Sequence, residues 1–581
     1  MQKRTPPPLT FDYTFSESER NTTKTPFPLV VMANYLNRLD FIKYINRRVS
    51  WDPTQCKFSP GVLAQLLVLV PFIPNQRRTC LCAIPHIYEK MNLELLTGYQ
   101  NDPVTEQAII PAELNDDLFG RLLDRIHAYG CSKLFQDLAV TVRTTFSLPP
   151  SYTFHSDTTS HVLYGNYPDT KENKSKNPKI KIAYGHSKDK QPNLLQIITG
   201  MITDEDGLPF LARVLDGNYS DTTWNGTIIS VLHEVLGPEF KKYIYVADSK
   251  CMTKTNYLAL VECFIPFVSR LPDNFCEKLS ERMKRRAYKE DNWESLGTCC
   301  TSPSKDAAVY HASAIQTRAH GFEVCVHVYK TTEKREKVER DVAREKERLG
   351  KEITRFCKEE FFCEKDAVVA MDSFLTSHSH LMIEAALEVV REVTYKKPRG
   401  RPGKNPKPPE EEIRWKIVDL GMNRKEEVIK AKIEKASTFC LITNTKPEEK
   451  SSREILMTYK GQSNVERQFS ILKQPLMADT IFLEKPERIE ALMVLIYFAA
   501  LLQGILRLIS RIELEKEKEP PRWGNERRAV TRPTARTMLW ILGKFTVIQK
   551  DGMTIIDATE REMEKEFEKI LRVVRFDSAF L

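Results

Sequence analysis

The stretch Tyr152-Thr-Phe-His-Ser-Asp-Thr-Thr-Ser160 marks the point where helical spacing gives way to strand-like patterns. Tyr152 and Phe154 alternate with polar residues, as expected for a strand with one buried face. Residues 179–184 alternate in the same way, and residues 194–203 form a short apolar run bounded by turn-forming residues. We therefore expect three successive strands.

The chain then alternates between helical and strand patterns. Residues 221–236 and 253–262 have helical spacing, while residues 243–247 and 264–268 are short apolar runs. The order strand-strand-strand-helix-strand-helix-strand predicts an α/β fold in which helices cover a mixed sheet.

Composition limits the class of protein. The 581 residues suggest about three or four domains, and a hydrophobic content of 41% is enough to bury a core. The net charge of +9 favours an anionic partner. The basic start of the chain lacks an apolar run, so we expect a cytoplasmic protein. Residues 491–509 are long enough to span a membrane but contain Gln503 and Arg507, and we expect a buried helix rather than a membrane span.

Two acidic residues are placed where a carboxylate needs a partner. Asp157 interrupts the first strand-like run, and Asp248 directly follows residues 243–247. A carboxylate in a sheet is costly to bury unless it is paired, hydrogen-bonded or bound to a metal. Magnesium accepts one or two carboxylates together with water and phosphate oxygens. The pattern therefore favours a magnesium site, and a third carboxylate would make two ions plausible.

The candidate for a third carboxylate is Glu466, within residues 458–474, which have helical spacing. On one continuous helix Tyr459, Gln462, Glu466 and Lys473 would share a face with Phe469. The alternative interpretation is a solvent-facing polar stripe with ordinary pairing along the helix.

Together these segments resemble the DDE transposases of bacterial and archaeal insertion sequences, in the branch with the signature Y-x2-R-x3-E-x6-K. Tyr459, Glu466 and Lys473 match the signature, while Gln462 stands at its arginine position and can donate hydrogen bonds without a charge. Further segments similar to the family are residues 155–160, 184–189, 203–209, 215–218 and 246–249.

The resemblance implies an RNase H-like catalytic core in which Asp157, Asp248 and Glu466 hold two Mg²⁺ ions, with Mn²⁺ as a substitute. One ion would activate the attacking water or 3′ hydroxyl, and the other would stabilise the leaving oxygen. The contacts to DNA that it implies are made by Tyr459, Gln462 and Lys473. The implied partner is double-stranded DNA, both element ends and target, bound by a homodimer or higher oligomer when two ends are synapsed. The implied location is cytoplasmic and nucleoid-associated.

Composition and local pattern, together with the resemblance, divide the chain into segments. These are a flexible segment (1–25), a helical domain that is a candidate for end binding (26–150), the first part of the core (151–270), an insertion domain with a basic Pro/Gly linker at 395–409 (271–454), the second part of the core (455–515) and a C-terminal helical region (516–581).

Within the basic linker, Arg399 and Arg401 form an Arg-Gly-Arg sequence that resembles an AT-hook, a motif that lies in a narrow minor groove. The alternative is a flexible basic linker without base preference. Two other functions stay open at this level: a catalytically silent DNA-binding protein derived from a transposase, and a metal-dependent nuclease without strand transfer.

Overall fold

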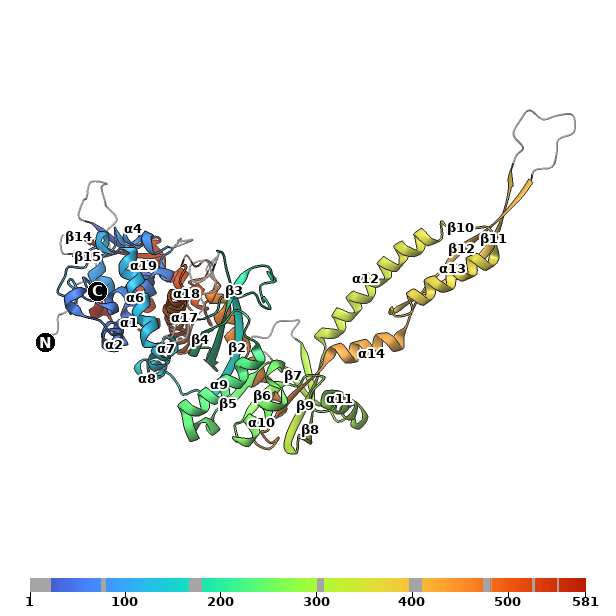
Figure 1. Ribbon diagram of the computed structural model, residues 1–581, viewed down its shortest axis with the longest axis horizontal. Helices are drawn as coiled ribbons and strands as arrows, with labels where there is room; N and C mark the ends of the chain where they lie inside the picture. The colour runs from blue at the N-terminus through green and yellow to red at the C-terminus, as the bar shows by residue number, and fades with distance from the viewer. Residues whose placement is uncertain are drawn as a thin grey trace, which may run out of the picture. The chain divides into compact units, whose positions relative to one another are not determined.

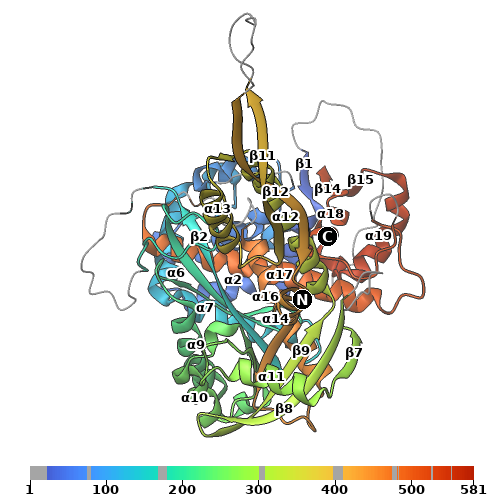
Figure 2. The same ribbon diagram turned by 90° about the vertical axis from the view of Figure 1, so that its right-hand side faces the viewer.

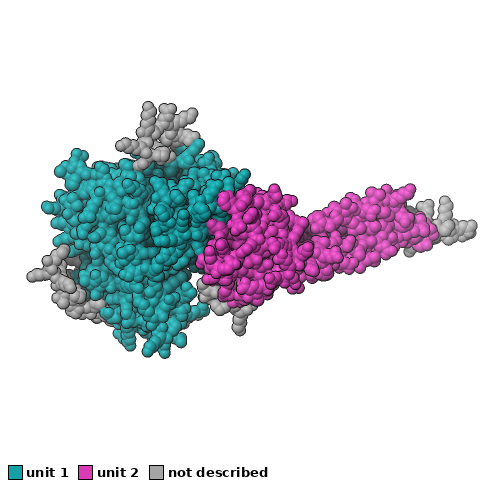
Figure 3. Space-filling model, turned by 90° about the horizontal axis from the view of Figure 1, so that it is seen from below, with its two compact units in different colours: residues 1–269, 458–581 teal, residues 270–457 magenta. Residues whose placement is uncertain are grey.

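The computed structural model describes residues 22–74, 80–165, 167, 180–299, 308–396, 410–473, 481, 483–524, 528–550 and 553–581. The chain forms two compact units, coloured separately in Figure 3. Unit 1 comprises Met1–Ser269 and Thr458–Leu581, and unit 2 comprises Arg270–Met457.

Unit 1 begins with a helical region, as the sequence predicts. Some of its helices begin at a capping residue: Ser59 accepts a hydrogen bond from the Val62 amide at the start of α3, and Asn115 caps α6. The helices are α1 (Phe27–Arg38), α2 (Phe41–Arg48), α3 (Pro60–Leu69), α4 (Ile84–Tyr88), α5 (Leu93–Thr97), α6 (Asp116–Tyr129), α7 (Cys131–Ala139) and α8 (Val142–Thr145).

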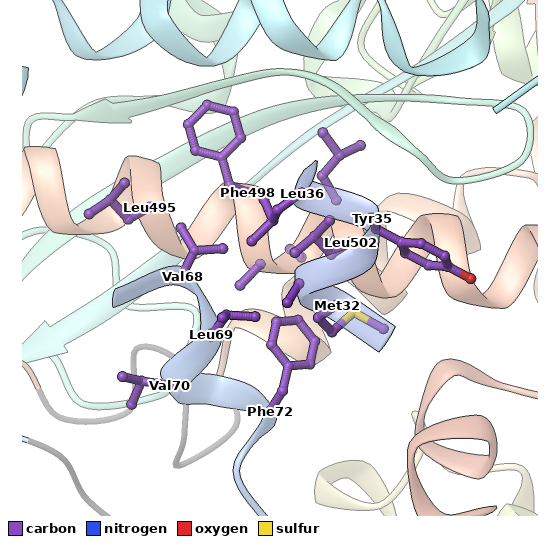
Figure 4. Packing of buried hydrophobic residues seen from close by; sticks show 14 of the residues in the cluster. Met32, Tyr35, Leu36, Val68, Leu69, Val70, Phe72, Leu495, Phe498 and Leu502 are labelled. Carbon is purple, nitrogen blue, oxygen red and sulfur yellow. The ribbon is translucent and has the colours of Figure 1, made fainter. Parts of the chain in front are cut away.

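Helices α3, α6 and α7 pack against α17 (Pro486–Leu514), the helix that contains residues 491–509. Although α17 is long and apolar enough to cross a membrane, most of its side chains are buried within the protein. Figure 4 shows Leu495, Phe498 and Leu502 facing side chains of α1 and α3. Each large apolar side chain buried in this way contributes about 1.5–3 kcal/mol. The prediction of a buried helix is therefore confirmed.

The mixed sheet of unit 1 has the predicted order of elements (Figure 1). Its strands lie in the order β4-β3-β2-β5-β6, with β2, β3 and β4 antiparallel and β2, β5 and β6 parallel. The elements are β2 (Thr153–Leu163), β3 (Leu195–Asp204), β4 (Pro209–Leu215), α9 (Asp221–Leu236), β5 (Ile244–Ala247), α10 (Lys254–Glu262) and β6 (Phe267–Arg270). The predicted α/β class, with an RNase H-like mixed sheet flanked by helices, is confirmed.

The position of one strand was predicted incorrectly. Residues 180–184 form only an isolated bridge, between Ala183 and Gln196, and the third antiparallel strand is β4. A tight turn returns the chain from β3 to β4: Gly207 adopts a φ of +74°, and the Asp204 side chain accepts hydrogen bonds from the amides of Asp206 and Leu208. Since this turn stabilises a hairpin, β4 rather than residues 179–184 pairs along β3.

The C-terminal region, for which the sequence predicts helices alone, also contains a small sheet. Strands β14 (Phe545–Lys550) and β15 (Met553–Ala558) lie between α18 (Ala535–Leu542) and α19 (Arg561–Val573), and β14 pairs with β1 (Thr23–Pro26). Part of the predicted flexible segment is therefore a strand. The partner of β1 is more than 500 residues away in the sequence, so no local pattern reveals the pairing.

Unit 2 contains two antiparallel sheets. Figure 2 shows β7, β8 and β9 side by side, and β13 pairs with β9. The second sheet has the order β10-β12-β11. The elements are α11 (Leu279–Glu290), β7 (Glu294–Thr298), β8 (Val309–Ala319), β9 (Phe322–Thr331), α12 (Glu333–Phe356), β10 (Glu360–Phe361), α13 (Glu364–Ser377), β11 (Ile383–Lys396), β12 (Glu410–Arg424), α14 (Glu426–Ser437) and β13 (Thr438–Thr443). Arg399 and Arg401 lie outside the described residues.

Candidate active site

Two of the three predicted carboxylates lie next to each other, directly after the stretch where β2 and β5 pair in parallel. The register pairs Ser156 with Ala247, so Asp157 and Asp248 are the next residues on neighbouring strands. The Asp248 side chain accepts a hydrogen bond from the amide of Lys250 at 3.0 Å. Parallel pairing thus brings together two acids that are far apart in the sequence.

Helix α16 (Ser463–Leu472) places Glu466 near the same part of β2. Gln462, which precedes this helix, donates a hydrogen bond of 2.7 Å from Nε2 to the carbonyl of Ser156, the residue before Asp157. Burial raises the pKa of Glu466, and the negative charge of Asp157 raises it further. The third acid therefore lies within electrostatic reach of the first.

The electrostatics of the two aspartates also show a concentration of negative charge. Burial raises the pKa of Asp157, and the Lys188 ammonium opposes this rise. Burial, followed by the charge of Asp157, raises the pKa of Asp248 to about 6. A divalent cation would relieve this repulsion.

The donor set suits magnesium because it consists of carboxylate oxygens. Among the described residues, no group of three or more His, Cys, Asp or Glu side chains could hold a metal ion by itself. Magnesium, however, usually takes only one or two carboxylates and completes its shell with water and phosphate oxygens. Two of these carboxylates could thus hold one ion together, and water and the phosphate oxygens of a substrate would complete its coordination shell.

A family model described as a transposase DDE domain matches residues 175–502, which is more than half of the chain and includes Asp248 and Glu466. The protein belongs to the transposase DDE domain family. Asp157 lies upstream of the matched residues. A second model, a domain of unknown function (DUF4277), matches residues 27–140 in the helical region. No curated protein matches the chain.

The transposase carries its signature residues on two helices, not on one. Helix α15 (Ser452–Lys460) contains Tyr459 and ends before Gly461, and α16 begins at Ser463. A Cβ atom at position 461 would lie 2.6 Å from the ring of His155, so close contact with β2 requires glycine where the chain bends. The predicted continuous helix over residues 458–474 is wrong, and Tyr459 and Glu466 do not share one helical face.

Gln462, a predicted DNA contact, is packed against β2. Its side chain is only 8% exposed and is bonded to the backbone of β2 through Ser156. The neighbouring His155 is also buried, which lowers its pKa to about 4. An arginine at position 462 would bury a positive charge beside His155, which is costly unless the charge is paired. In this structure Gln462 links α16 to the strand of Asp157.

Lys188 and Asp221 belong to the site, although sequence reasoning gave them no role. Lys188 Nζ lies 3.4 Å from Asp157 Oδ1 and 3.3 Å from Asp221 Oδ1. It also donates a hydrogen bond of 2.8 Å to the Thr158 carbonyl. Lys188 falls in the 184–189 segment that resembles the family, and this resemblance is the signal that could have indicated it.

Lys473, at the C-terminal end of α16, forms an ion pair with Asp189. Asp189 also accepts a hydrogen bond of 3.1 Å from Ser160 Oγ on β2. The lysine that the resemblance assigns to DNA is thus paired with a carboxylate, and a phosphate would have to compete for it.

Proposed function

We propose that this transposase binds the inverted-repeat ends of an insertion sequence and catalyses metal-dependent strand cleavage and strand transfer. The observation that carries the proposal is the pairing of Ser156 with Ala247, which sets Asp157 beside Asp248. Helix α16, which packs against β2 and is bonded to Ser156 through Gln462, carries the third acid, Glu466.

Asp157, Asp248 and Glu466 would hold two Mg²⁺ ions, for which Mn²⁺ could substitute. When bound, the ions supply activation of the attacking water or 3′ hydroxyl and stabilisation of the leaving oxygen in an in-line displacement. The protein contributes positioning: β2 and β5 fix the two aspartates, and the bond from Gln462 to β2 holds α16 against them. In the protein without DNA, Lys188 balances part of the charge of Asp157.

The substrate would be double-stranded DNA, at the element ends and at the target. Tyr459 and Lys473 are the proposed phosphate contacts on the two sides of Glu466. Synapsis of two ends would require a homodimer or higher oligomer. The helical region at residues 27–140 is the candidate for end recognition, and the protein would act in the cytoplasm at the nucleoid.

The test uses labelled DNA that carries the ends of the flanking element, incubated with the purified protein in Mg²⁺ or in EDTA. We expect nicking and joining in Mg²⁺ alone, with both lost in the variants Asp157→Asn and Glu466→Gln. The matched control is Glu568→Gln, because Glu568 is an exposed glutamate on α19.

Three results would contradict the proposal. End binding without cleavage would indicate the catalytically silent DNA-binding protein. Cleavage without joining would indicate a nuclease. Full cleavage by either active-site variant would refute the assignment of the carboxylates.

A further inference from the structure

Four arginines gather on unit 1 near the helix of Glu466. Arg507 and Arg511 are one turn apart on α17, so they lie on the same face of the helix. Arg511 Nε donates a hydrogen bond of 3.0 Å to the carbonyl of Pro533, which places it next to Arg532. Arg467 lies on α16, directly after Glu466.

The turn between β3 and β4 holds α16 and α17 together at this point. Arg507 donates a hydrogen bond to the carbonyl of Asp206 in this turn. Two side chains of α16 reach the same turn: Asn464 Nδ2 donates to the Glu205 carbonyl and Gln468 Nε2 to the Gly207 carbonyl, each at 2.7 Å. The arginines on the two helices are therefore brought together by a defined set of contacts.

The positive charge of this arginine cluster (Arg467, Arg507, Arg511 and Arg532) exceeds the negative charge that lies beside it. The acids of the turn, Asp204 and Asp206, are both ion-paired with Arg143. Neither Arg467 nor Arg532 forms an ion pair with a carboxylate of the described residues, and both are exposed.

The pKa of Arg511 reflects the same excess of positive charge. Burial lowers the pKa of Arg511 to about 10, and the charges of Arg507, Arg532 and Arg467 contribute to the decrease. An excess of like charge destabilises the folded protein. A polyanionic ligand would supply the missing negative charge, and the planar guanidinium group is well suited to bidentate phosphate binding.

We propose that Arg467, Arg511 and Arg532 form a binding site for a phosphate of the DNA backbone. Because Arg467 and Glu466 lie on the same helix, α16, the bound phosphate would belong to the duplex that is cleaved. Arg507 keeps the turn and the two helices in place. This inference rests on the proposed function, since it names a further contact to the same DNA.

The test compares the salt dependence of DNA binding. The double variant Arg467→Gln/Arg532→Gln removes the two exposed members of the cluster, and the single variant Arg511→Gln removes the half-buried one. Binding of the full-length protein to a short labelled duplex is followed by fluorescence anisotropy between about 50 and 200 mM salt. The control double variant, Arg285→Gln/Arg572→Gln, removes the same charge from exposed arginines that are already paired with glutamates.

We expect the slope of log K against log salt concentration to become shallower by about 0.9 for each phosphate that the variant no longer neutralises. The control should keep the slope of the unmodified protein. The melting temperature of the double variant without DNA should be unchanged or higher, since repulsion is removed.

Two results would overturn the inference: a slope in both cluster variants equal to that of the control, or a lowered melting temperature with an unchanged slope, which would show a structural role. Both results leave DNA binding by the unmodified protein intact. Failure of the unmodified protein to bind or cut DNA would instead refute the proposed function, so the two failures are distinguishable.

Discussion

Replacing Asp248 by asparagine should stabilise the transposase in the absence of metal while removing its activity. Burial and the charge of Asp157 raise the pKa of Asp248 from 3.8 to about 6. A carboxyl group whose pKa is raised by folding costs stability when it ionises, so this cost is absent below about pH 4 and complete above about pH 6. Asparagine keeps a side-chain oxygen that can accept the hydrogen bond from the Lys250 amide. This bond is 3.0 Å long in the unmodified protein.

The size of the effect follows from the shift of the pKa. A rise from 3.8 to about 6 corresponds to about 3 kcal/mol, at about 1.4 kcal/mol for each pKa unit. Because Asp248 is partly exposed, solvent screens the repulsion, and we expect about 1–2 kcal/mol. In a protein of this size that should raise the melting temperature by about 1–2 °C.

The assay is thermal unfolding of both proteins in EDTA across a pH series. The difference in melting temperature should be near zero at about pH 4, grow up to about pH 6 and then stay constant. The control Asp372→Asn, at an exposed position of α13, should show no such growth. Added Mg²⁺ should stabilise the unmodified protein more than the Asp248→Asn variant. A variant that is less stable than the unmodified protein at pH 8 would refute the reasoning.

Two further predictions concern the groups around the carboxylates. Gln462→Ala removes the hydrogen bond to Ser156 and should cost about 1–3 kcal/mol of stability. It should also slow single-turnover cleavage at an unchanged affinity for DNA, and equal cleavage rates would contradict its positioning role. Asp189→Asn frees Lys473 and should raise DNA affinity by about twofold to fivefold, the range of an exposed ion pair. The same gain in a Lys473→Gln background would show that Lys473 does not contact DNA.

The arrangement of the core could be predicted because local patterns determine it. The alternation around Phe154 predicts β2, and the helical spacing of residues 221–236 predicts α9. Helix α9 begins and ends at the predicted residues. The β3–β4 hairpin was missed because it depends on the side chain of Asp204 and on the positive φ of Gly207, not on the alternation of apolar residues.

The candidate site was less predictable because several of its features depend on contacts between distant segments. The break between α15 and α16 follows from the approach of Gly461 to His155, two residues on different elements. The burial of Gln462 has the same origin. Lys188 reaches Asp157 from a segment that lies outside the regular strands and helices, so periodicity could not have indicated it.

The central claim is that Asp157, Asp248 and Glu466 hold the divalent ions that act on DNA. Anomalous diffraction from crystals of the transposase with a DNA duplex and Mn²⁺ tests it most directly. The account predicts Mn²⁺ bound to carboxylate oxygens of these residues and to a phosphate oxygen of the DNA. Bound DNA with Mn²⁺ located away from all three carboxylates would contradict it.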